Sequence, residues 1–356
     1  MKIEQYRIIE KSLLGEFLTA LISVSKVVAP VYKGFNTYSF QEIKSPDEIS
    51  LKYIPTILPP KKFFLPQRET ILQFNIKPEL KVEPVAEYDN TVLFGVHTCD
   101  IAGFRCLNTV LSDSPKDTAY LIRKKYVTII GLECNDYCDE YASCSLVGAN
   151  IPTTGYDLMF TDLGEYFIVH MHSLKGAEII KNTNDLFKVA EESHMKELEA
   201  LREKKSKIFI NEVPTERRYL PELFDRSWNA SVWQEVEEKC LSCGNCTAVC
   251  PTCYCFDIRD EVNLSLSSGE RYRVWFSCQL DPFAKVAGGI DFRRERSARQ
   301  RHRYYRKFRY HIDRYGMIFC TGCGRCSRTC MAGINLKEVL TSLIRESEAK
   351  IWRKWL

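Results

Sequence analysis

Several features common in membrane proteins and nucleotide-binding enzymes are missing from this chain of 356 residues. No apolar run approaches the ~20 residues that a membrane-spanning helix needs, so we expect no membrane span. No G-x-G-x-x-G sequence opens a β-α-β unit, and no phosphate-binding loop is visible, so we expect no flavin or NAD(P) site in this chain. The net charge of +4 is too small to indicate a nucleic-acid partner by itself.

The composition is otherwise that of an ordinary globular protein, with 45% hydrophobic and 27% charged residues, and the length leaves room for two or three domains. The first residues, MKIEQYRIIEK, mix acidic with basic side chains and do not have the pattern of a signal peptide. Sixteen cysteines without an export signal are typical of a reducing compartment in which thiolates hold metal. We therefore expect a cytoplasmic location.

The cysteines are concentrated in two runs with the same internal spacing. Residues 240–255 read CLSCGNCTAVCPTCYC and residues 320–330 read CTGCGRCSRTC, so C-x2-C-x2-C-x3-C occurs twice. This is the known spacing of proteins that bind two [4Fe–4S] clusters. A zinc site would use four ligands and leave the third regularly spaced cysteine of each run without a role, and disulfides need an oxidising compartment. The two runs therefore predict two [4Fe–4S] clusters.

Each cluster is expected to take its fourth ligand from the other run. Three closely spaced thiolates wrap three corners of a cubane, whereas the fourth cysteine follows too far round the turn to reach the same cluster. The first cluster is predicted to bind Cys240, Cys243, Cys246 and Cys330. The second cluster is predicted to bind Cys320, Cys323, Cys326 and Cys250.

A third cluster is predicted in the N-terminal half. An apolar run at residues 91–97, a helical pattern and a second apolar run at residues 126–132 indicate a β-α-β unit with parallel strands. Cysteines then follow the carboxyl ends of neighbouring strands, where open α/β sheets bind their ligands. The cysteines expected at this edge are Cys99, Cys134, Cys138 and Cys144. The alternative is a set of unligated thiols, which is how we interpret Cys106 in the connecting helix.

Three further cysteines, Cys253, Cys255 and Cys278, have no role in these patterns. Exchange into a cluster, binding of another metal, and simple packing are all compatible with their positions. His97 lies two residues before Cys99 and is a possible donor to a cluster sulfur, although packing within a strand is the simpler explanation.

Residues 293–314 are strongly basic, and aromatic side chains are interleaved with the arginines and lysines. This pattern suits a nucleic-acid groove, where cations neutralise phosphates and rings stack on bases. Anionic clusters offer another explanation, because neighbouring arginines offset their charge, donate hydrogen bonds to sulfur and raise the reduction potential. Since the net charge of the whole chain is small, we favour cluster support or subunit contact. Lys61 and Lys62 are expected in a solvated turn, with contact to an acidic ligand or partner as the alternative.

We expect two domains joined by a linker. Residues 1–205 should form an α+β or α/β domain with a small, partly parallel sheet, and residues 206–220 should form the linker. Residues 221–356 should form an all-α domain of the α-helical ferredoxin type with two clusters, because helix-length patterns fill part of the insert between the cysteine runs.

Some individual elements are also predicted. Residues 8–24 and 185–205 have helical spacing, the latter as a charged and solvated helix. Residues 155–172 alternate around a Leu-Gly-Glu turn, which is typical of a hairpin. The last residues form an amphipathic pattern that ends in Trp352, Trp355 and Leu356. We expect this end to dock on the core of the chain itself, with docking on a partner subunit or on a membrane surface as the alternatives.

Seven segments, spread in order over nearly the whole chain, resemble those of one known family: LPPKKFFLPQRETILQF, FGVHTCDIAGFRCL, GYDLMF, CLSCGNCTAVCPTCYCFDIRD, WFSCQ, VAGGIDFR and CTGCGRCSRTC. The chain resembles the beta (iron–sulfur) subunit of NAD(P)-linked hydrogenases of the sulfhydrogenase type, and it is also similar to the A subunit of anaerobic sulfite reductase. By this resemblance Cys99 and Cys134 match N-terminal cluster motifs. The family then has a compact CFC pair, whereas the loop here is longer and Cys138 and Cys144 are the nearest counterparts. Met331 stands where a proline usually follows the last cysteine.

The resemblance implies an electron-transfer subunit without a catalytic centre of its own. In such complexes a flavin subunit exchanges hydride with NAD(P)H, and the iron–sulfur subunit relays single electrons to or from a catalytic subunit. The expected partners are therefore a flavin/NAD(P)-binding subunit and a catalytic subunit of the hydrogenase or sulfite reductase type, without nucleic acid. The alternatives are an enzyme in its own right, with an open coordination site on the N-terminal cluster, and a nucleic-acid binder with structural clusters.

Overall fold

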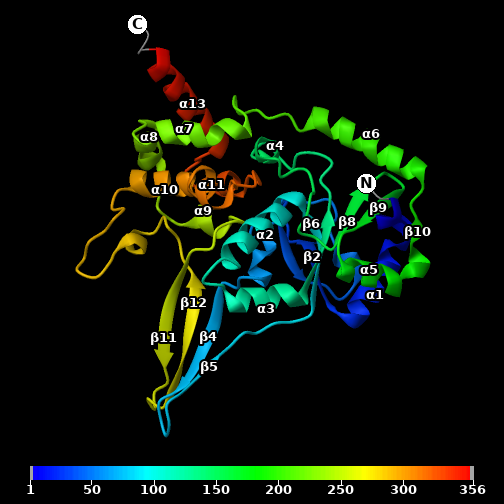
Figure 1. Ribbon diagram of the computed structural model, residues 1–356, viewed down its shortest axis with the longest axis horizontal. Helices are drawn as coiled ribbons and strands as arrows, with labels where there is room; N and C mark the ends of the chain where they lie inside the picture. The colour runs from blue at the N-terminus through cyan, green and yellow to red at the C-terminus, as the bar shows by residue number, and fades with distance from the viewer. Residues whose placement is uncertain (1–2, 353–356) are drawn as a thin grey trace.

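The computed structural model describes residues 3–352, with two β-sheets and a group of helices (Figure 1). The larger sheet has eight strands in the order β10-β1-β9-β8-β7-β6-β2-β3. In chain order these strands are β1 (Tyr6–Glu10), β2 (Lys26–Tyr32), β3 (Tyr38–Glu42), β6 (Thr91–His97), β7 (Val127–Leu132), β8 (Leu158–Asp162), β9 (Tyr166–Met171) and β10 (Lys188–Val189).

The parallel part of this sheet contains the predicted β-α-β unit. β6 pairs parallel with β7, with Thr91 opposite Val127, and β2 and β8 extend the parallel set on either side. The connection consists of α2 (Thr98–Leu111) and α3 (Thr118–Tyr126). All seven residues of β6 are buried, as expected for an apolar strand covered on both faces. The partly parallel sheet is confirmed, but it is not small, because antiparallel strands flank the parallel set on both sides.

The predicted helix at residues 8–24 is wrong at its start. Residues 6–10 form β1, which pairs antiparallel with β9, and α1 (Leu14–Val24) begins only after a short 3-10 turn. Ile8 and Ile9 fit a helical as well as an extended pattern, and pairing with a distant strand decides between them. The predicted hairpin at residues 155–172 is confirmed by the antiparallel pair of β8 and β9.

The other N-terminal helices are α4 (Cys144–Val147), α5 (Leu174–Asn182) and α6 (Glu192–Ile208). α6 starts later than the predicted charged helix, and it is not solvated all round. Lys205 of α6 is buried, and its Nζ lies 2.5 Å from a carboxylate oxygen of buried Glu133.

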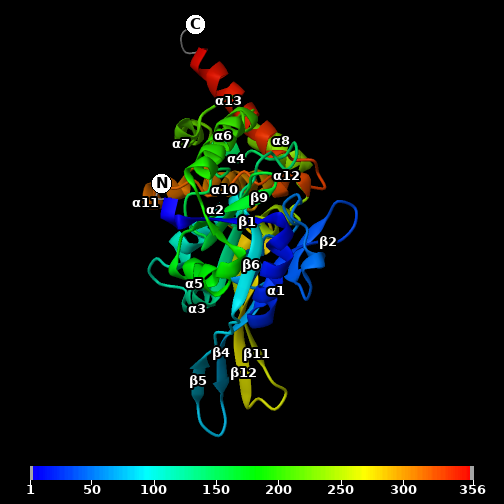
Figure 2. The ribbon, with the colours of Figure 1, turned by 90° about the vertical axis from the view of Figure 1, so that its right-hand side faces the viewer.

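A second, four-stranded sheet joins the two halves of the chain. Its order is β11-β12-β4-β5, and it extends away from the rest of the molecule (Figures 1 and 2). Its strands are β4 (Arg68–Asn75), β5 (Lys81–Pro84), β11 (Phe256–Val262) and β12 (Ser268–Trp275). The all-α description of the C-terminal region is therefore not confirmed, since two strands lie in the insert between the cysteine runs. These strands form because β12 finds an antiparallel partner in β4 of the N-terminal half.

The helical part lies at the opposite end of the molecule from the tip of the protruding strands (Figure 1). Its helices are α7 (Leu220–Arg226), α8 (Val232–Lys239), α9 (Asn245–Ala248), α10 (Arg296–Phe308), α11 (Tyr310–Tyr315), α12 (Arg325–Arg328) and α13 (Leu336–Trp352). α7, α8, α10 and α13 share one apolar core, to which α4 of the N-terminal half contributes Leu146 and Val147. The predicted domain boundaries stay a prediction.

Two predictions concern the chain end and membranes. Trp355 and Leu356, for which we expect docking on the core, lie outside the described residues. Among residues 3–352, no helix combines the length and the apolar character that crossing a bilayer requires.

Candidate iron–sulfur centres

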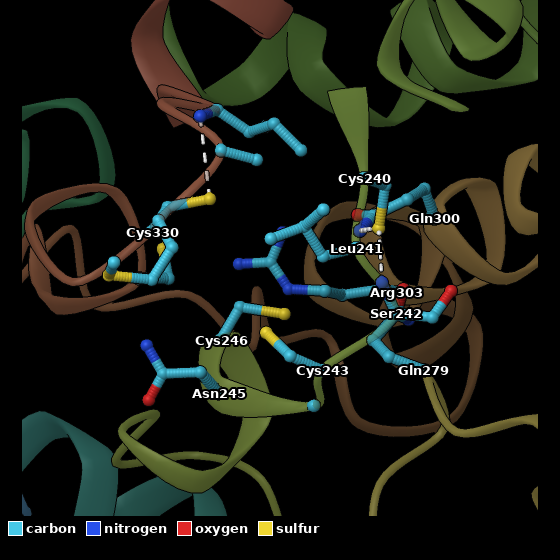
Figure 3. Close-up of a pocket in the computed structure, with 15 residues that line it drawn as sticks. Cys240, Leu241, Ser242, Cys243, Asn245, Cys246, Gln279, Gln300, Arg303 and Cys330 are labelled. Carbon is cyan, nitrogen blue, oxygen red and sulfur yellow. Dashed lines mark hydrogen bonds between the residues drawn. The ribbon is translucent and has the colours of Figure 1, made fainter. Parts of the chain in front are cut away.

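The first cavity collects the four cysteines predicted for the first cluster. Its walls include Cys240, Cys243, Cys246 and Cys330, which surround one space in Figure 3. Cys240 follows α8, Cys243 lies in the loop before α9, Cys246 lies in α9, and Cys330 follows α12. The fold thus brings a cysteine of the second run to three cysteines of the first, as crossed ligation requires.

The second cavity collects the other four cysteines, Cys250, Cys320, Cys323 and Cys326. It adjoins the first cavity, because Arg303 and Cys326 line both. The short helices α9 and α12, one from each run, pack against each other. The individual ligand assignments stay predictions, but the spacing and the fold agree on two neighbouring sites.

Sulfur atoms in both cavities accept hydrogen bonds from N–H groups. Gln300 Nε2 donates to Cys240 Sγ at 2.9 Å, and backbone N–H groups donate at 3.4 Å to Cys240, Cys320 and Cys330. Such bonds stabilise sulfur that carries negative charge. Burial raises the pKa of Cys246 to about 12, so this thiol would give up its proton in exchange for a metal rather than to water.

Arg303 supplies a buried positive charge between the two cavities. Its side chain is 5% exposed, and its Nε has no hydrogen-bond partner among the described residues. Burial alone would lower the pKa of this guanidinium, but the nearby Cys246 and Cys326 raise it well above the ordinary value. A buried cation with an unused N–H fits beside an anionic centre. The donor set and the charge of these cavities therefore suit [4Fe–4S] clusters held by four thiolates each.

One face of α10 directs basic residues inward. Arg299, Arg303 and Lys307 are four residues apart, which puts them on one helix face, and all three are buried. The aromatic rings of the same helix pack in the helical core: Tyr304, Tyr305 and Phe308. These cations and rings are therefore turned away from the phosphates and bases of a nucleic acid. Their burial favours cluster support, and the four-residue spacing is the signal in the sequence that identifies this face.

Among the four N-terminal cysteines, Cys134 lies near enough to each of the other three to act on it electrostatically. Burial is the main cause that raises the pKa values of Cys99, Cys138 and Cys144, and the charge of Cys134 adds to the increase at each. Cys134 and Cys138 also line an open cavity at the sheet edge, together with His97. This proximity supports the predicted third site, while its ligands stay a prediction.

The loop that leads into Cys144 packs directly on the second cysteine run. Gly322 has a φ of +63°, and a Cβ there would approach Ser143 to 2.3 Å; Gly324 has a φ of +73°, and a Cβ there would approach Tyr141 to 2.8 Å. The Ser143 N–H donates to the Gly322 carbonyl oxygen at 2.7 Å. Only glycine suits both positions, because of the positive φ and the close backbone approach. The N-terminal site therefore lies next to the second cavity.

Lys61 is not solvated, contrary to the expectation. It is 2% exposed, its Nζ donates to the Cys253 carbonyl oxygen at 2.6 Å, and it lies over the Trp275 ring at 4.3 Å from the centroid. Lys62 is partly exposed. The two prolines before Lys61 correctly indicate a turn, but local sequence contains no sign that β12 covers it.

Comparison with known proteins agrees with these sites. Residues 239–334, which contain both cysteine runs and α10, match the 4Fe-4S dicluster domain family. Over 325 residues the chain is 37% identical to the sulfhydrogenase 2 subunit beta of Pyrococcus furiosus, a match that covers 91% of this chain and 94% of that protein. The chain belongs to the family of sulfhydrogenase beta subunits.

Proposed function

We propose that this protein is the electron-transfer subunit of a multi-subunit oxidoreductase of the hydrogenase or sulfhydrogenase type. In this role it relays single electrons between a flavin subunit that uses NAD(P)H and a catalytic subunit. [4Fe–4S] clusters, when bound, supply one-electron storage at each centre. The proposal depends chiefly on the row of adjoining thiolate sites. The first cavity shares Arg303 and Cys326 with the second, and Ser143, next to Cys144, lines the second.

The residues of the chain itself prepare these sites for added negative charge. The buried guanidinium of Arg303 and the amide of Gln300 both lie at the first cavity, where they stabilise the more negative, reduced state. The identity of the terminal substrate is set by the partner that receives or supplies the electrons, not by this chain.

The first cavity is the proposed contact with a partner subunit. Cys243 is exposed, and the same cavity is lined by Leu241 and Met331, which are 64% and 87% exposed. Apolar side chains around an exposed cluster ligand suit a surface that another subunit covers. A partner centre that docks there would come close to the first cluster.

Anaerobic purification of the protein from its native source, followed by identification of the co-purifying subunits, tests this function. We expect a flavin/NAD(P)-binding subunit and a catalytic subunit to elute with the chain. In a recombinant complex, Leu241→Asp with Met331→Asp should weaken that association, while Leu174→Asp on α5, where the side chain is 91% exposed, should not. Elution of the wild-type chain alone, with NAD(P)H oxidation by the isolated chain, would contradict the proposal.

This proposal also includes the third cluster and a cytoplasmic location. It includes the division of the chain into two domains, residues 1–205 and 221–356, joined by a linker at residues 206–220. The location is proposed from the sequence, because sixteen cysteines in patterns that hold metal are typical of a reducing compartment. The third cluster is supported by the placement of the N-terminal cysteines beside the second cavity.

A further inference from the structure

Three cysteines outside the predicted cluster ligands line a cavity of their own. Cys253 and Cys255 follow the first run closely, and Cys278 comes from the segment after β12. The fold brings these two segments together across the base of the β11–β12 hairpin, where the Phe276 N–H donates to the Cys255 carbonyl oxygen at 2.9 Å. The other walls are mostly cationic or aromatic and include Arg303, Arg306, Lys307, His311 and Phe319.

Two of the three sulfur atoms accept hydrogen bonds. Lys307 Nζ lies 3.2 Å from Cys253 Sγ, and Gln279 Nε2 lies 3.4 Å from Cys278 Sγ. The amide of Gln279 thus donates to a cysteine sulfur in the same way as the amide of Gln300 does in the first cavity. Donors of this kind favour negative charge on the sulfur that accepts the bond, as a cluster ligand requires.

The buried cations around this cavity also favour negative charge within it. Lys61 and Lys307 are 2% and 7% exposed, and both hydrogen-bond to Cys253, one at the carbonyl oxygen and one at the sulfur. Arg303 is buried on the same wall. Cations buried in this way are costly unless negative charge lies beside them. Three thiolates supply that charge.

The spacing of the side chains argues against a single ion. Within residues 3–352, no three His, Cys, Asp or Glu side chains are gathered closely enough to hold one metal ion, in this cavity or elsewhere. A zinc site would need four donors around one atom, whereas the sulfurs of a cluster each ligate a different iron. We propose that Cys253, Cys255 and Cys278 ligate a further iron–sulfur cluster, for which His311 on the same wall is the fourth ligand.

This cluster stands beside the second one. Its cavity shares Arg303 and Lys307 with the second cavity. Cys253 and Cys255 also line an open cavity together with Cys243 of the first site. The proposed cluster is therefore close to both predicted clusters, and one side of it faces a passage to solvent.

Iron analysis of an anaerobically purified full-length variant tests the inference. Four clusters correspond to about 16 iron atoms per chain and three to about 12. The double variant Cys255→Ser with Cys278→Ser should lose about four iron atoms and one EPR signal, while the signals of the two dicluster sites persist. Cys106→Ser is the matched control, because this buried cysteine lines none of the cavities and should keep all the iron.

Two readouts on other forms of the protein keep the inference testable if the double variant does not fold. Native mass spectrometry of the wild-type chain should show the mass of four clusters, and His311→Cys should keep the iron count but change the spectrum of one cluster. Unchanged iron in the double variant, loss of zinc instead of iron, or a Cys255–Cys278 disulfide in the wild-type protein would overturn the inference. None of these measurements needs a partner subunit, so their failure is distinct from failure of the proposed function.

Discussion

Arg325 and Asp100 form a bidentate ion pair that is buried completely. Two guanidinium nitrogens lie 2.7 and 2.8 Å from the two carboxylate oxygens, and neither side chain is exposed to solvent. Arg325 Nε also donates to the Thr56 carbonyl oxygen at 2.6 Å. Because Arg325 precedes Cys326 and Asp100 follows Cys99, the pair fixes the N-terminal cysteine edge against the second cavity.

Removal of this arginine should destabilise the protein strongly. Arg325→Met leaves Asp100 as an unpaired buried charge, and we expect a loss of about 3–5 kcal/mol in the free energy of unfolding. Urea unfolding under anaerobic conditions, followed by circular dichroism, measures it. Arg226→Met is the control, because Arg226 and Glu222 form an exposed pair on α7 whose loss should cost about 0.5 kcal/mol or less. Equal losses in the free energy of unfolding would show that the buried pair stabilises the protein no more than the exposed pair does.

The amide of Gln300 should raise the reduction potential of the first cluster. It donates to Cys240 Sγ at 2.9 Å, and a bond to sulfur is strongest in the reduced state, which is more negative. Gln300→Met should therefore lower this potential by about 40 mV, the equivalent of one hydrogen bond of about 1 kcal/mol. A potentiometric titration followed by EPR measures the shift. Gln234→Met, at an exposed position of α8, should leave the reduction potential unchanged. If this variant lowers the potential as much as Gln300→Met does, the hydrogen bond to Cys240 is not the cause.

Crossed ligation predicts which substitutions share a spectral effect. Cys250→Ser should alter the EPR signal that Cys320→Ser alters, although Cys250 belongs to the first run. Cys330→Ser should alter the signal that Cys240→Ser alters. The four variants are compared after reduction with dithionite. If Cys250→Ser instead changes the same signal as Cys240→Ser, each run binds its own cluster and the crossed assignment is wrong.

Features that depend on spacing along the chain could be predicted from the sequence. The two cysteine runs predict two sets of four residues that the fold places around two cavities, and the apolar runs predict the parallel pair of β6 and β7. Such features depend on local geometry, because three thiolates within seven residues can surround one cluster wherever the run lies in the fold. The buried face of α10 can also be identified from the sequence, because Arg299, Arg303 and Lys307 are spaced four residues apart.

Features that depend on distant partners could not be predicted in this way. Lys61 resembles a solvated turn residue until Trp275 covers it. Ile8 fits a helix until β9 pairs with its segment. The insert between the cysteine runs contains strands because β12 pairs with β4, almost two hundred residues earlier in the chain. In each case the deciding contact comes from a segment that no local pattern identifies.

His97 should make the folded state sensitive to mild acid. It is buried and stacks on Tyr53, with ring centroids 3.8 Å apart. Burial, with a contribution from Arg325, lowers the pKa of His97 to about 3. Unfolded histidine has a pKa of about 6.5, so the unfolded state takes up a proton first as the pH falls. The resulting stabilisation is complete above pH ~6.5, is lost as the pH falls toward ~3, and has dropped by about 1.4 kcal/mol at pH 5.5.

His97→Phe tests this linkage because it keeps an aromatic ring against Tyr53 but removes the titrating group. The difference in unfolding free energy between pH 7.5 and 5.5 should be smaller in the variant by about 1.4 kcal/mol. Urea titrations of both proteins at the two pH values measure it. The same pH dependence in the variant and the wild type would rule out His97 as the cause.

We propose that this chain carries electrons but does not exchange hydride itself, and anaerobic mixing of the protein with NAD(P)H decides this point. The EPR signals of the reduced clusters are recorded with and without a flavin subunit obtained by co-purification. We predict that NAD(P)H alone leaves the clusters oxidised, that dithionite reduces them, and that NAD(P)H reduces them once the flavin subunit is present. Reduction by NAD(P)H in the isolated chain, or no reduction in the presence of the flavin subunit, would show that the chain does not act as an electron relay.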